Sequence, residues 1–248
     1  MEPNLSVVIP AHNESERLGP TLAAISSYFE AEHISAEVIV VDDGSTDDTG
    51  TLAESILDNG NGWVTSYRNC RGKGYAVRAG VAKARGQWIL FSDADLSTPI
   101  EEYRKLSTIA ERDNLDLVLG SRGLPESQIE VFQSRLRQNL GKCFNLIVKT
   151  ISRLPFSDTQ CGFKLFRRQS VAPIFAEMVV DGFAFDVELL VLCKHAGLRM
   201  LEVPVIWRND PRSSVRLLSS PPQMLLDVVK TMVRLRCGRY RVGAKPAS

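Results

Sequence analysis

Short apolar runs alternate with longer segments of mixed character through the first half of the chain. The runs are rich in β-branched and aromatic residues, which favour strands. The intervening segments space their apolar residues three or four apart, as helices packed on a core do. The predicted strands are residues 5–9, 37–41, 63–67 and 87–91, and the predicted helices are residues 16–29, 47–57 and 74–84. This alternation predicts an α/β fold with a largely parallel sheet.

The second half of the chain is less regular. It predicts a strand at 115–119 after a helix that Pro99 can start, a helix at 131–151, a strand at 162–166, a helix at 186–195 and a strand at 199–205. A final amphipathic segment, residues 222–236, carries Lys230, Arg234 and Arg236 among its apolar residues. Packing on the core and docking on a membrane surface both fit it. We expect a main domain over residues 1–220, and a basic helix and tail over 221–248 that is a candidate for membrane contact.

Composition adds a charge asymmetry to this picture. The 248 residues are 44% hydrophobic and 24% charged, which is ordinary for a soluble globular protein. The net charge is +1, but from Arg199 onward there are ten Lys and Arg against three Asp and Glu, so the rest of the chain carries −6. A basic C-terminus suits anionic substrates or an anionic membrane surface. No nucleic-acid recognition motif is present, so we expect no nucleic-acid partner.

The cysteines and the apolar runs limit the cellular location. Five cysteines are scattered without a CxxC pair, which argues against a complete disulfide framework. The N-terminus has no basic-then-apolar signal segment, and no apolar run approaches the roughly 20 residues that span a bilayer. We therefore expect a cytoplasmic protein, or one bound peripherally to the cytoplasmic face of a membrane.

Two acids stand at the end of a buried strand. Asp93 and Asp95 follow the apolar residues 88–91. Such acids resist burial unless they face water, meet basic partners or hold a cation. Oxygen ligands of this kind suit Mg²⁺ or Mn²⁺ together with substrate phosphates. The alternative is that a strand-end Asp caps the following helix.

Two further motifs follow neighbouring strands. Asp42 and Asp43 can accept hydrogen bonds from a nucleotide base or ribose, although Asp43 in a helix cap is an equal alternative. Arg71 to Gly74 combines two cations and two glycines before a helix, a composition suited to pyrophosphate or to a surface turn. Because ligands bind beyond the carboxyl ends of parallel strands, we expect residues 10–14, 42–45, 68–74 and 93–95 to converge on one crevice.

Residues 6–14, 40–47, 69–74 and 93–95 together carry a more specific signal. In order and spacing they resemble the motifs of family two glycosyltransferases, and the resemblance spans nearly the whole chain. Residues 93–99, 120–122, 158–166 and 185–190 are similar to those of dolichyl-phosphate β-glucosyltransferases and, less closely, of polyprenyl-phosphate mannose synthases. The resemblance implies the GT-A fold, a Rossmann-like, mostly parallel central sheet flanked by helices. It also implies an inverting, metal-dependent enzyme that moves a hexose from a nucleotide-sugar donor to a lipid-phosphate acceptor.

The resemblance assigns roles to individual residues. The residues implied to bind the nucleotide sugar are Pro10, Ala11, Glu14, Asp42, Asp43, Lys73, Asp93 and Arg212. Those implied to take part in catalysis are Asp95, Arg122, Arg135 and Asp186, with Arg122 and Arg135 near the acceptor phosphate. Asp93 and Asp95 would hold Mg²⁺ or Mn²⁺ on the diphosphate.

Asp186 and Glu188 stand where relatives place an Asp that orients or deprotonates an acceptor hydroxyl. A phosphate acceptor is already ionised at neutral pH and needs no strong base, so Asp186 is interpreted as a residue that orders the site. A helix cap is an equal alternative, and a hydroxyl acceptor would instead make Asp186 a base. The expected donor is UDP-glucose, and the alternative donor is GDP-mannose. The alternative to an enzyme is a nucleotide-sugar sensor that has lost turnover.

The sequence departs from these relatives in two places. A Gly-Ser-Lys sequence is replaced by residues 209–216, where Arg212 or Arg216 would supply the missing cation. An N-terminal membrane anchor is also absent from the sequence. We therefore expect any membrane attachment to depend on the C-terminal amphipathic segment and to be reversible.

Overall fold

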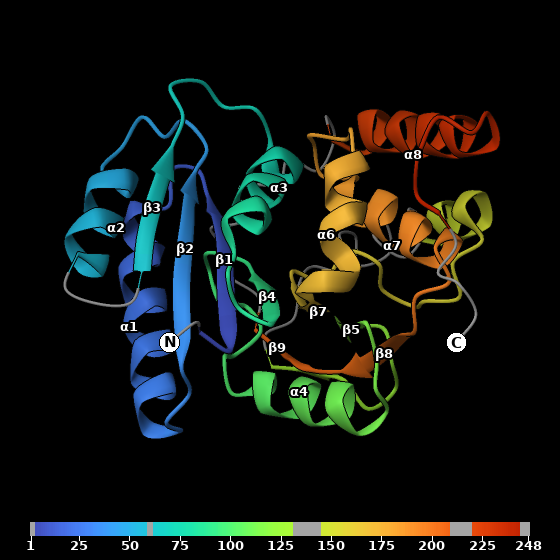
Figure 1. Cartoon of the computed structure of the whole chain (residues 1–248). Coiled ribbons are helices and arrows are strands. Elements are labelled where there is room, and N and C mark those ends of the chain that lie inside the picture. Colours follow the sequence, from blue (N-terminus) through green and yellow to red (C-terminus); the bar gives the residue numbers. More distant parts are fainter. Residues whose placement is uncertain (1–2, 59–61, 131–144, 209–219, 244–248) are drawn as a thin grey trace.

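The structure, a computed structural model, describes residues 3–58, 62–130, 145–208 and 220–243. A seven-stranded sheet lies between helices on both of its faces (Figure 1). The strands of this sheet are β1 (Leu5–Ala11), β2 (Ala36–Asp42), β3 (Gly62–Ser66), β4 (Trp88–Ser92), β5 (Leu117–Ser121), β7 (Phe163–Arg167) and β8 (Met200–Pro204). The named helices are α1 (Ser15–Ala31), α2 (Thr49–Leu57), α3 (Lys73–Lys83), α4 (Glu102–Arg112), α6 (Arg168–Glu177), α7 (Phe185–His195) and α8 (Ser220–Arg236).

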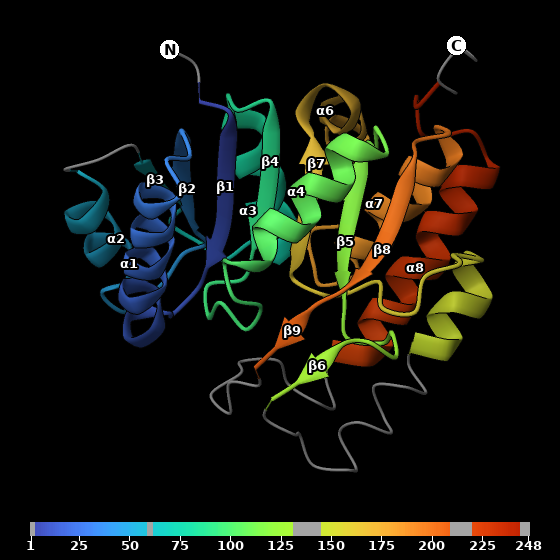
Figure 2. The ribbon, with the colours of Figure 1, turned by 90° about the horizontal axis from the view of Figure 1, so that it is seen from below.

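The strand order is β3-β2-β1-β4-β7-β5-β8, and β7 alone runs antiparallel to its neighbours β4 and β5. The predicted α/β fold with a mostly parallel sheet is therefore confirmed. Two short strands, β6 (Gln128–Ile129) and β9 (Ile206–Trp207), pair with each other outside this sheet (Figure 2). In the main sheet Ala11 lies opposite Asp42, so the loops that follow β1 and β2 leave the sheet side by side.

Alternate strand residues build two apolar layers, because successive side chains point to opposite faces of a sheet. In β2, Val38 and Val40 pack with α1, α2 and α4, whereas Ile39 and Val41 pack with α3, α6 and α7. Both faces of the sheet are thus covered, which explains why the strands read as nearly continuous apolar runs.

Two details differ from the sequence expectations, and a third expectation lies partly outside the described residues. The helix that Pro99 was expected to start begins at Glu102, after a turn in which the Glu102 N–H donates to the Pro99 carbonyl at 3.1 Å. The helix α6 was not predicted, since Pro173 interrupts its helical pattern. Of the helix expected at 131–151, residues 145–152 are helical and residues 131–144 lie outside the described ranges.

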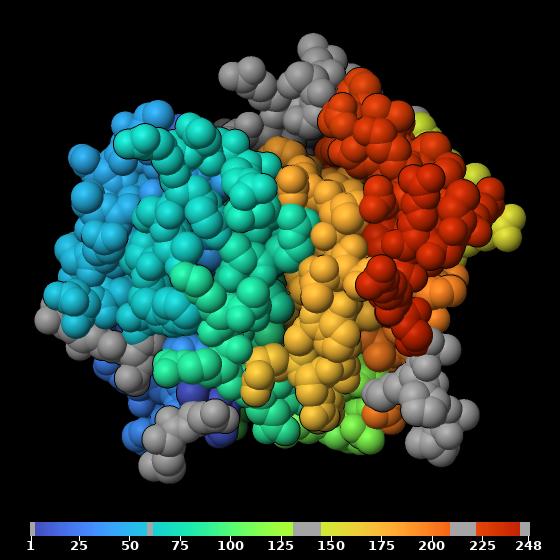
Figure 3. Space-filling model, turned by 45° about the horizontal axis from the view of Figure 1, so that its top comes forward, coloured from blue at the N-terminus to red at the C-terminus, as the bar shows by residue number. Residues whose placement is uncertain are grey.

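The C-terminal helix α8 lies on the outside of the layer formed by α6 and α7 (Figure 3). Val228 is buried against that layer, and Met224, Leu225 and Met232 pack on it in part. Three other apolar side chains of α8 face solvent: Leu226, Val229 and Val233 are 48%, 43% and 53% exposed. Apolar residues of α8 are therefore available both for packing on the core and for contact with a membrane. The domain boundary at residue 220 stays a prediction.

Across the described ranges, no helix has the length and apolar character needed to cross a bilayer.

Candidate functional site

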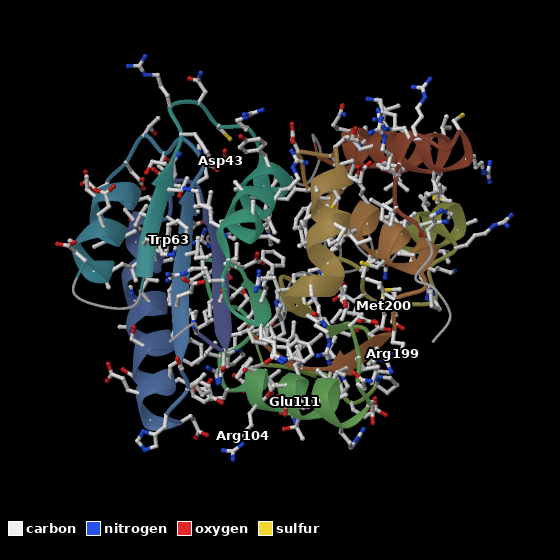
Figure 4. All side chains as sticks on the ribbon, in the orientation of Figure 1. Asp43, Trp63, Arg104, Glu111, Arg199 and Met200 are labelled. Carbon is white, nitrogen blue, oxygen red and sulfur yellow. The ribbon has the colours of Figure 1, made fainter. Side chains whose placement is uncertain are left out.

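The loops that follow β1, β2 and β4 come together at the carboxyl ends of these strands, as expected. The Asp43 N–H donates to the Ala11 carbonyl at 2.8 Å, and the Asn13 N–H donates to the Ser45 hydroxyl at 2.9 Å. Lys73, which begins α3, then reaches Asp93 after β4. Figure 4 shows Asp43 at the end of the sheet toward which β2 and β3 point, far from Arg104 and Glu111 on α4.

Asp43 organises the loop that precedes α3. Its carboxylate accepts hydrogen bonds from the N–H groups of Arg71 at 2.8 Å and Gly72 at 2.7 Å, and from the Cys70 thiol at 3.3 Å. Its neighbour Asp42 accepts from the Ser45 N–H at 3.1 Å. The alternative in which Asp43 caps the next helix is wrong, since α2 follows Asp48 and has no side-chain cap. Both acids are almost fully buried, and these hydrogen bonds hold their carboxylates in place.

The first turn of α3 is closed by protein and is not open to a phosphate. The N–H groups of Gly74 and Tyr75 donate to the Asp181 carbonyl at 2.7 and 3.2 Å. Gly72 has φ of +114°, and a Cβ there would meet the Asp181 oxygen at 2.5 Å. These glycines therefore admit the segment 178–184 against α3. Of the two cations in residues 71–74, the Lys73 ammonium lies against Asp93, whereas Arg71 lies over the Tyr75 ring.

Lys73 forms an ion pair with Asp93, with 2.6 Å between Lys73 Nζ and Asp93 Oδ1. Burial alone lowers the pKa of Lys73, but the charges of Asp93 and Asp186 raise it, and the net shift is upward. The Lys73 Nζ also lies 5.4 Å from the ring centre of Phe91. Lys73 is therefore a permanent cation next to the aspartate pair.

Asp95 and Glu14 share a basic neighbour that sequence analysis missed. Arg17 donates two hydrogen bonds of 2.6 Å to the Glu14 carboxylate, and its second terminal nitrogen lies 3.8 Å from Asp95 Oδ2. Burial raises the pKa of Glu14 and of Asp95, and the charge of Asp93 raises the pKa of Asp95 further. Glu14 was expected to contact the nucleotide, and here its carboxylate holds Arg17 one helical turn away. The available signal was the spacing of three residues between Glu14, which precedes α1, and Arg17 in its first turn.

The chemistry of the aspartate pair fits a divalent cation. A Cβ on Gly162 would overlap the Asp93 carboxylate, so this glycine makes room for it. The Asp93 Oδ1 atom is buried and is in contact with the Lys73 ammonium. Within the described parts of the chain, no three His, Cys, Asp or Glu residues gather to hold a metal. Two carboxylates are nevertheless what a magnesium site uses when substrate phosphates supply further ligands.

Asp186 is paired with a lysine that sequence analysis did not assign. The Lys164 Nζ donates to Asp186 Oδ1 at 2.6 Å and to the Cys161 carbonyl at 2.5 Å. Lys164 is 0% and Asp186 3% exposed. Burial raises the pKa of Asp186, and the charges of Lys164 and Lys73 oppose that shift. The capping alternative is wrong, because the cap position of α7 is Ala184 and it has no side-chain cap bond. A lysine between Phe163 and Leu165 in a strand was the signal for a buried ion pair.

Arg122 is held by Asp158 at the end of β5. The Arg122 Nε and one terminal nitrogen donate to the two Asp158 carboxylate oxygens at 2.6 and 2.9 Å. The backbone N–H of Arg122 donates to Asp158 Oδ2 at 3.1 Å. The charge of Arg122 overcomes the effect of burial and lowers the pKa of Asp158 to about 2. The guanidinium also lies 5.4 Å from the Trp207 ring centre. A guanidinium has five N–H donors, so Arg122 keeps donors for a phosphate. Arg135 and Arg212 lie outside the described residues.

Comparisons with known proteins agree with the family that the sequence motifs indicate, over most of the chain. The sequence matches the family model described as Glycosyl transferase family 2 over residues 6–175. It is 34% identical to the dolichyl-phosphate beta-glucosyltransferase of Dictyostelium discoideum, over 96% of this chain and 76% of that protein.

Two solved structures share the fold at 21% sequence identity. Mannosyl-3-phosphoglycerate synthase from Rubrobacter xylanophilus matches with a TM-score of 0.68, over 99% of this chain and 78% of that one. Glucosyl-3-phosphoglycerate synthase from Mycobacterium tuberculosis, solved with Mn²⁺, UDP-glucose and phosphoglyceric acid, matches with a TM-score of 0.65, over 95% and 80%.

Proposed function

Because the chain belongs to glycosyl transferase family 2, we propose that it transfers glucose from UDP-glucose to a dolichyl or other polyprenyl phosphate, with inversion at the anomeric carbon. The observation that carries this proposal is the placement of Lys73 against Asp93, with Asp95 beside them, at the carboxyl ends of the strands. The name of the Dictyostelium relative supports the choice of sugar and acceptor.

Different residues of the site are proposed to bind the donor and the acceptor. Asp42, Asp43, Pro10 and Ala11 lie at the ends of β1 and β2, where the base and ribose of the donor would bind. Lys73 stays protonated and can donate to the diphosphate as negative charge develops on it. The acceptor phosphate is ionised at neutral pH, so no residue has to remove a proton from it.

The acceptor phosphate would be met by arginines. Arg122 is oriented by Asp158, and Arg135 is proposed to serve the acceptor phosphate with it, as the resemblance implies. Holding the two reactants in line supplies much of the rate acceleration in such a displacement.

The burial of Asp186 favours a phosphate over a hydroxyl acceptor. A base for a hydroxyl must reach the acceptor, whereas the Asp186 side chain is 5% exposed and paired with Lys164. Asp186 is therefore proposed to order the site, together with Lys164.

We propose Asp93 and Asp95 as the residues that hold a Mg²⁺ or Mn²⁺ ion. When bound, this ion supplies positive charge to the leaving diphosphate. The Mn²⁺ in the solved Mycobacterium relative supports a divalent ion of this kind. We expect Asp95→Asn to lower transfer by about a hundredfold at limiting metal, because an electrostatic contact in the transition state is lost. Wild-type transfer by this variant across a Mg²⁺ or Mn²⁺ titration would exclude the assignment.

The donor and acceptor are tested together in one assay. The protein is incubated with UDP-glucose, UDP-galactose, GDP-mannose or GDP-glucose, a divalent ion and a short polyprenyl phosphate, and lipid-linked product is measured. UDP-glucose should give the highest kcat/KM. A higher value with GDP-mannose would replace the sugar assignment. Transfer to a polyprenol but not to a polyprenyl phosphate would show that the acceptor is a hydroxyl compound. Donor binding without transfer to either acceptor would indicate a nucleotide-sugar sensor.

Membrane contact is proposed for the exposed face of α8. Leu226, Val229 and Val233 lie on the outside of this helix, and the side chain of Lys230 is 57% exposed among them. Apolar and basic side chains together suit the surface of an anionic bilayer on the cytoplasmic side. The triple variant Leu226→Ser, Val229→Ser and Val233→Ser should lose cosedimentation with phosphatidylserine vesicles and retain transfer to a water-soluble short-chain acceptor. Equal sedimentation of variant and wild type would exclude this face.

A further inference from the structure

A chain of hydrogen bonds runs from the segment after α8 to the first turn of α3. It begins at Tyr240, which is 7% exposed and whose hydroxyl donates to Glu188 Oε1 at 2.7 Å. Arg234 of α8 lies 5.7 Å from the centre of the same ring. The Arg241 N–H makes a separate contact, to Glu177 at the end of α6, at 2.9 Å.

Glu188 is a fully buried acid whose partners are these segments of the chain. Its carboxylate accepts from the Val179 N–H at 3.0 Å and from the Val180 N–H at 2.9 Å, in addition to Tyr240. Burial raises the pKa of Glu188, and these three donors oppose the shift. A buried acid with several donors fixes the groups that donate to it, because each lost hydrogen bond to a charged group is costly. Glu188 therefore fixes the start of the segment 178–184.

The same segment fixes the start of α3. The carbonyl of Asp181 accepts from Gly74 and Tyr75, and the Asp181 carboxylate pairs with Arg78 one turn further along α3. The Phe183 ring centre lies 5.9 Å from Lys73 Nζ. The segment thus contacts both the backbone of the first turn and the cation that the turn presents.

We propose that Tyr240 and Glu188 are positioning residues for donor binding. By holding residues 178–184 they set the first turn of α3, and with it the direction in which Lys73 points toward Asp93. This proposal rests on the proposed function in one respect, the contact of Lys73 with the donor diphosphate. The link also joins the segment after α8 to the site.

The test removes one oxygen atom. Tyr240→Phe keeps the ring and its packing but leaves Glu188 without its side-chain donor. We expect kcat/KM for UDP-glucose to fall about tenfold, the effect of one hydrogen bond to a charged group, while KM for the lipid phosphate stays unchanged. Amide hydrogen exchange should become faster in a peptide that covers residues 72–77, because the amides of Gly74 and Tyr75 lose protection.

The matched control is Glu177→Ala, which removes the neighbouring contact of the C-terminal segment and leaves Glu188 intact. It should change neither the exchange of residues 72–77 nor kcat/KM for UDP-glucose. If Tyr240→Phe does not fold, Glu188→Gln is measured in the same way and should show the same faster exchange.

The proposal is overturned by unchanged exchange of residues 72–77, by an unchanged kcat/KM for UDP-glucose, or by equal effects of the control and Tyr240→Phe. The exchange measurement needs no turnover. A wild-type protein that transfers no sugar would therefore contradict the proposed function, whereas faster exchange in Tyr240→Phe would still support the coupling of Tyr240 to α3.

Discussion

Lys164 and Asp186 show at the scale of single residues how a buried pair makes each partner depend on the other. Both are removed from water, and each supplies the opposite charge that the other needs. We expect Lys164→Met to lower the free energy of unfolding by about 3 kcal/mol, because it leaves Asp186 buried without its ion-pair partner. Urea unfolding at pH 7 measures this loss.

The double variant Lys164→Met and Asp186→Leu distinguishes a lost pair from a disturbed core. It removes both charges, so it should be more stable than Lys164→Met alone. A double variant that is less stable than the single one would show that packing around the lysine stem, and not the unpaired acid, causes the loss. Transfer should be lost in both variants, since the site then lacks Asp186 in its fixed position.

At the scale of elements, the antiparallel strand β7 supports the aspartate pair. Gly162 precedes β7, and its carbonyl accepts from the Asp93 N–H at 3.0 Å. A Cβ at residue 162 would overlap the Asp93 carboxylate and force it aside. We expect Gly162→Ala to reduce kcat/KM by about a hundredfold, the scale of a misplaced group, with little change in the far-ultraviolet circular dichroism spectrum.

A substitution of the same kind on α1 controls for the added methyl group. A Cβ on Gly19 would meet Leu52 and Ile56 at 3.8 and 3.9 Å, which are ordinary contact distances. Gly19→Ala should therefore retain wild-type transfer. If Gly162→Ala also retained it, the close approach of β7 to Asp93 would have no part in the reaction.

The same elements show what the sequence could and could not predict. Residues 37–41 and 87–91 predicted β2 and β4 because apolar runs between helices are local signals. The antiparallel direction of β7 was not predicted, since the run at 162–166 has the same pattern in either direction. The contact of the Asp181 carbonyl with α3 joins residues more than 100 positions apart in the chain through a backbone atom, and no side-chain pattern marks it.

At the scale of the whole molecule, stability in acid should depend on Asp158, which ties β5 to the segment before β7. Its pKa is lowered from 3.8 to about 2, so its contribution to stability is complete above the unfolded-state value and is lost as the pH falls through about 2. The shift corresponds to about 2 kcal/mol. Asp158→Asn should therefore be less stable than wild type at pH 6, and the difference should shrink between pH 5 and pH 2.

Urea unfolding across this pH range measures the effect, and an exposed pair provides the comparison. Asp113 accepts two hydrogen bonds from Arg112 on the surface, where solvent screens the pair. Asp113→Asn should follow the wild-type pH profile. A difference between Asp158→Asn and wild type that stays constant from pH 6 to pH 2 would mean that Asp158 acts through neutral hydrogen bonds to its neighbours. The hydrogen bonds between Asp158 and Arg122 would then persist after protonation of Asp158, and the proposed role of Arg122 at the acceptor phosphate would not depend on the charge of Asp158.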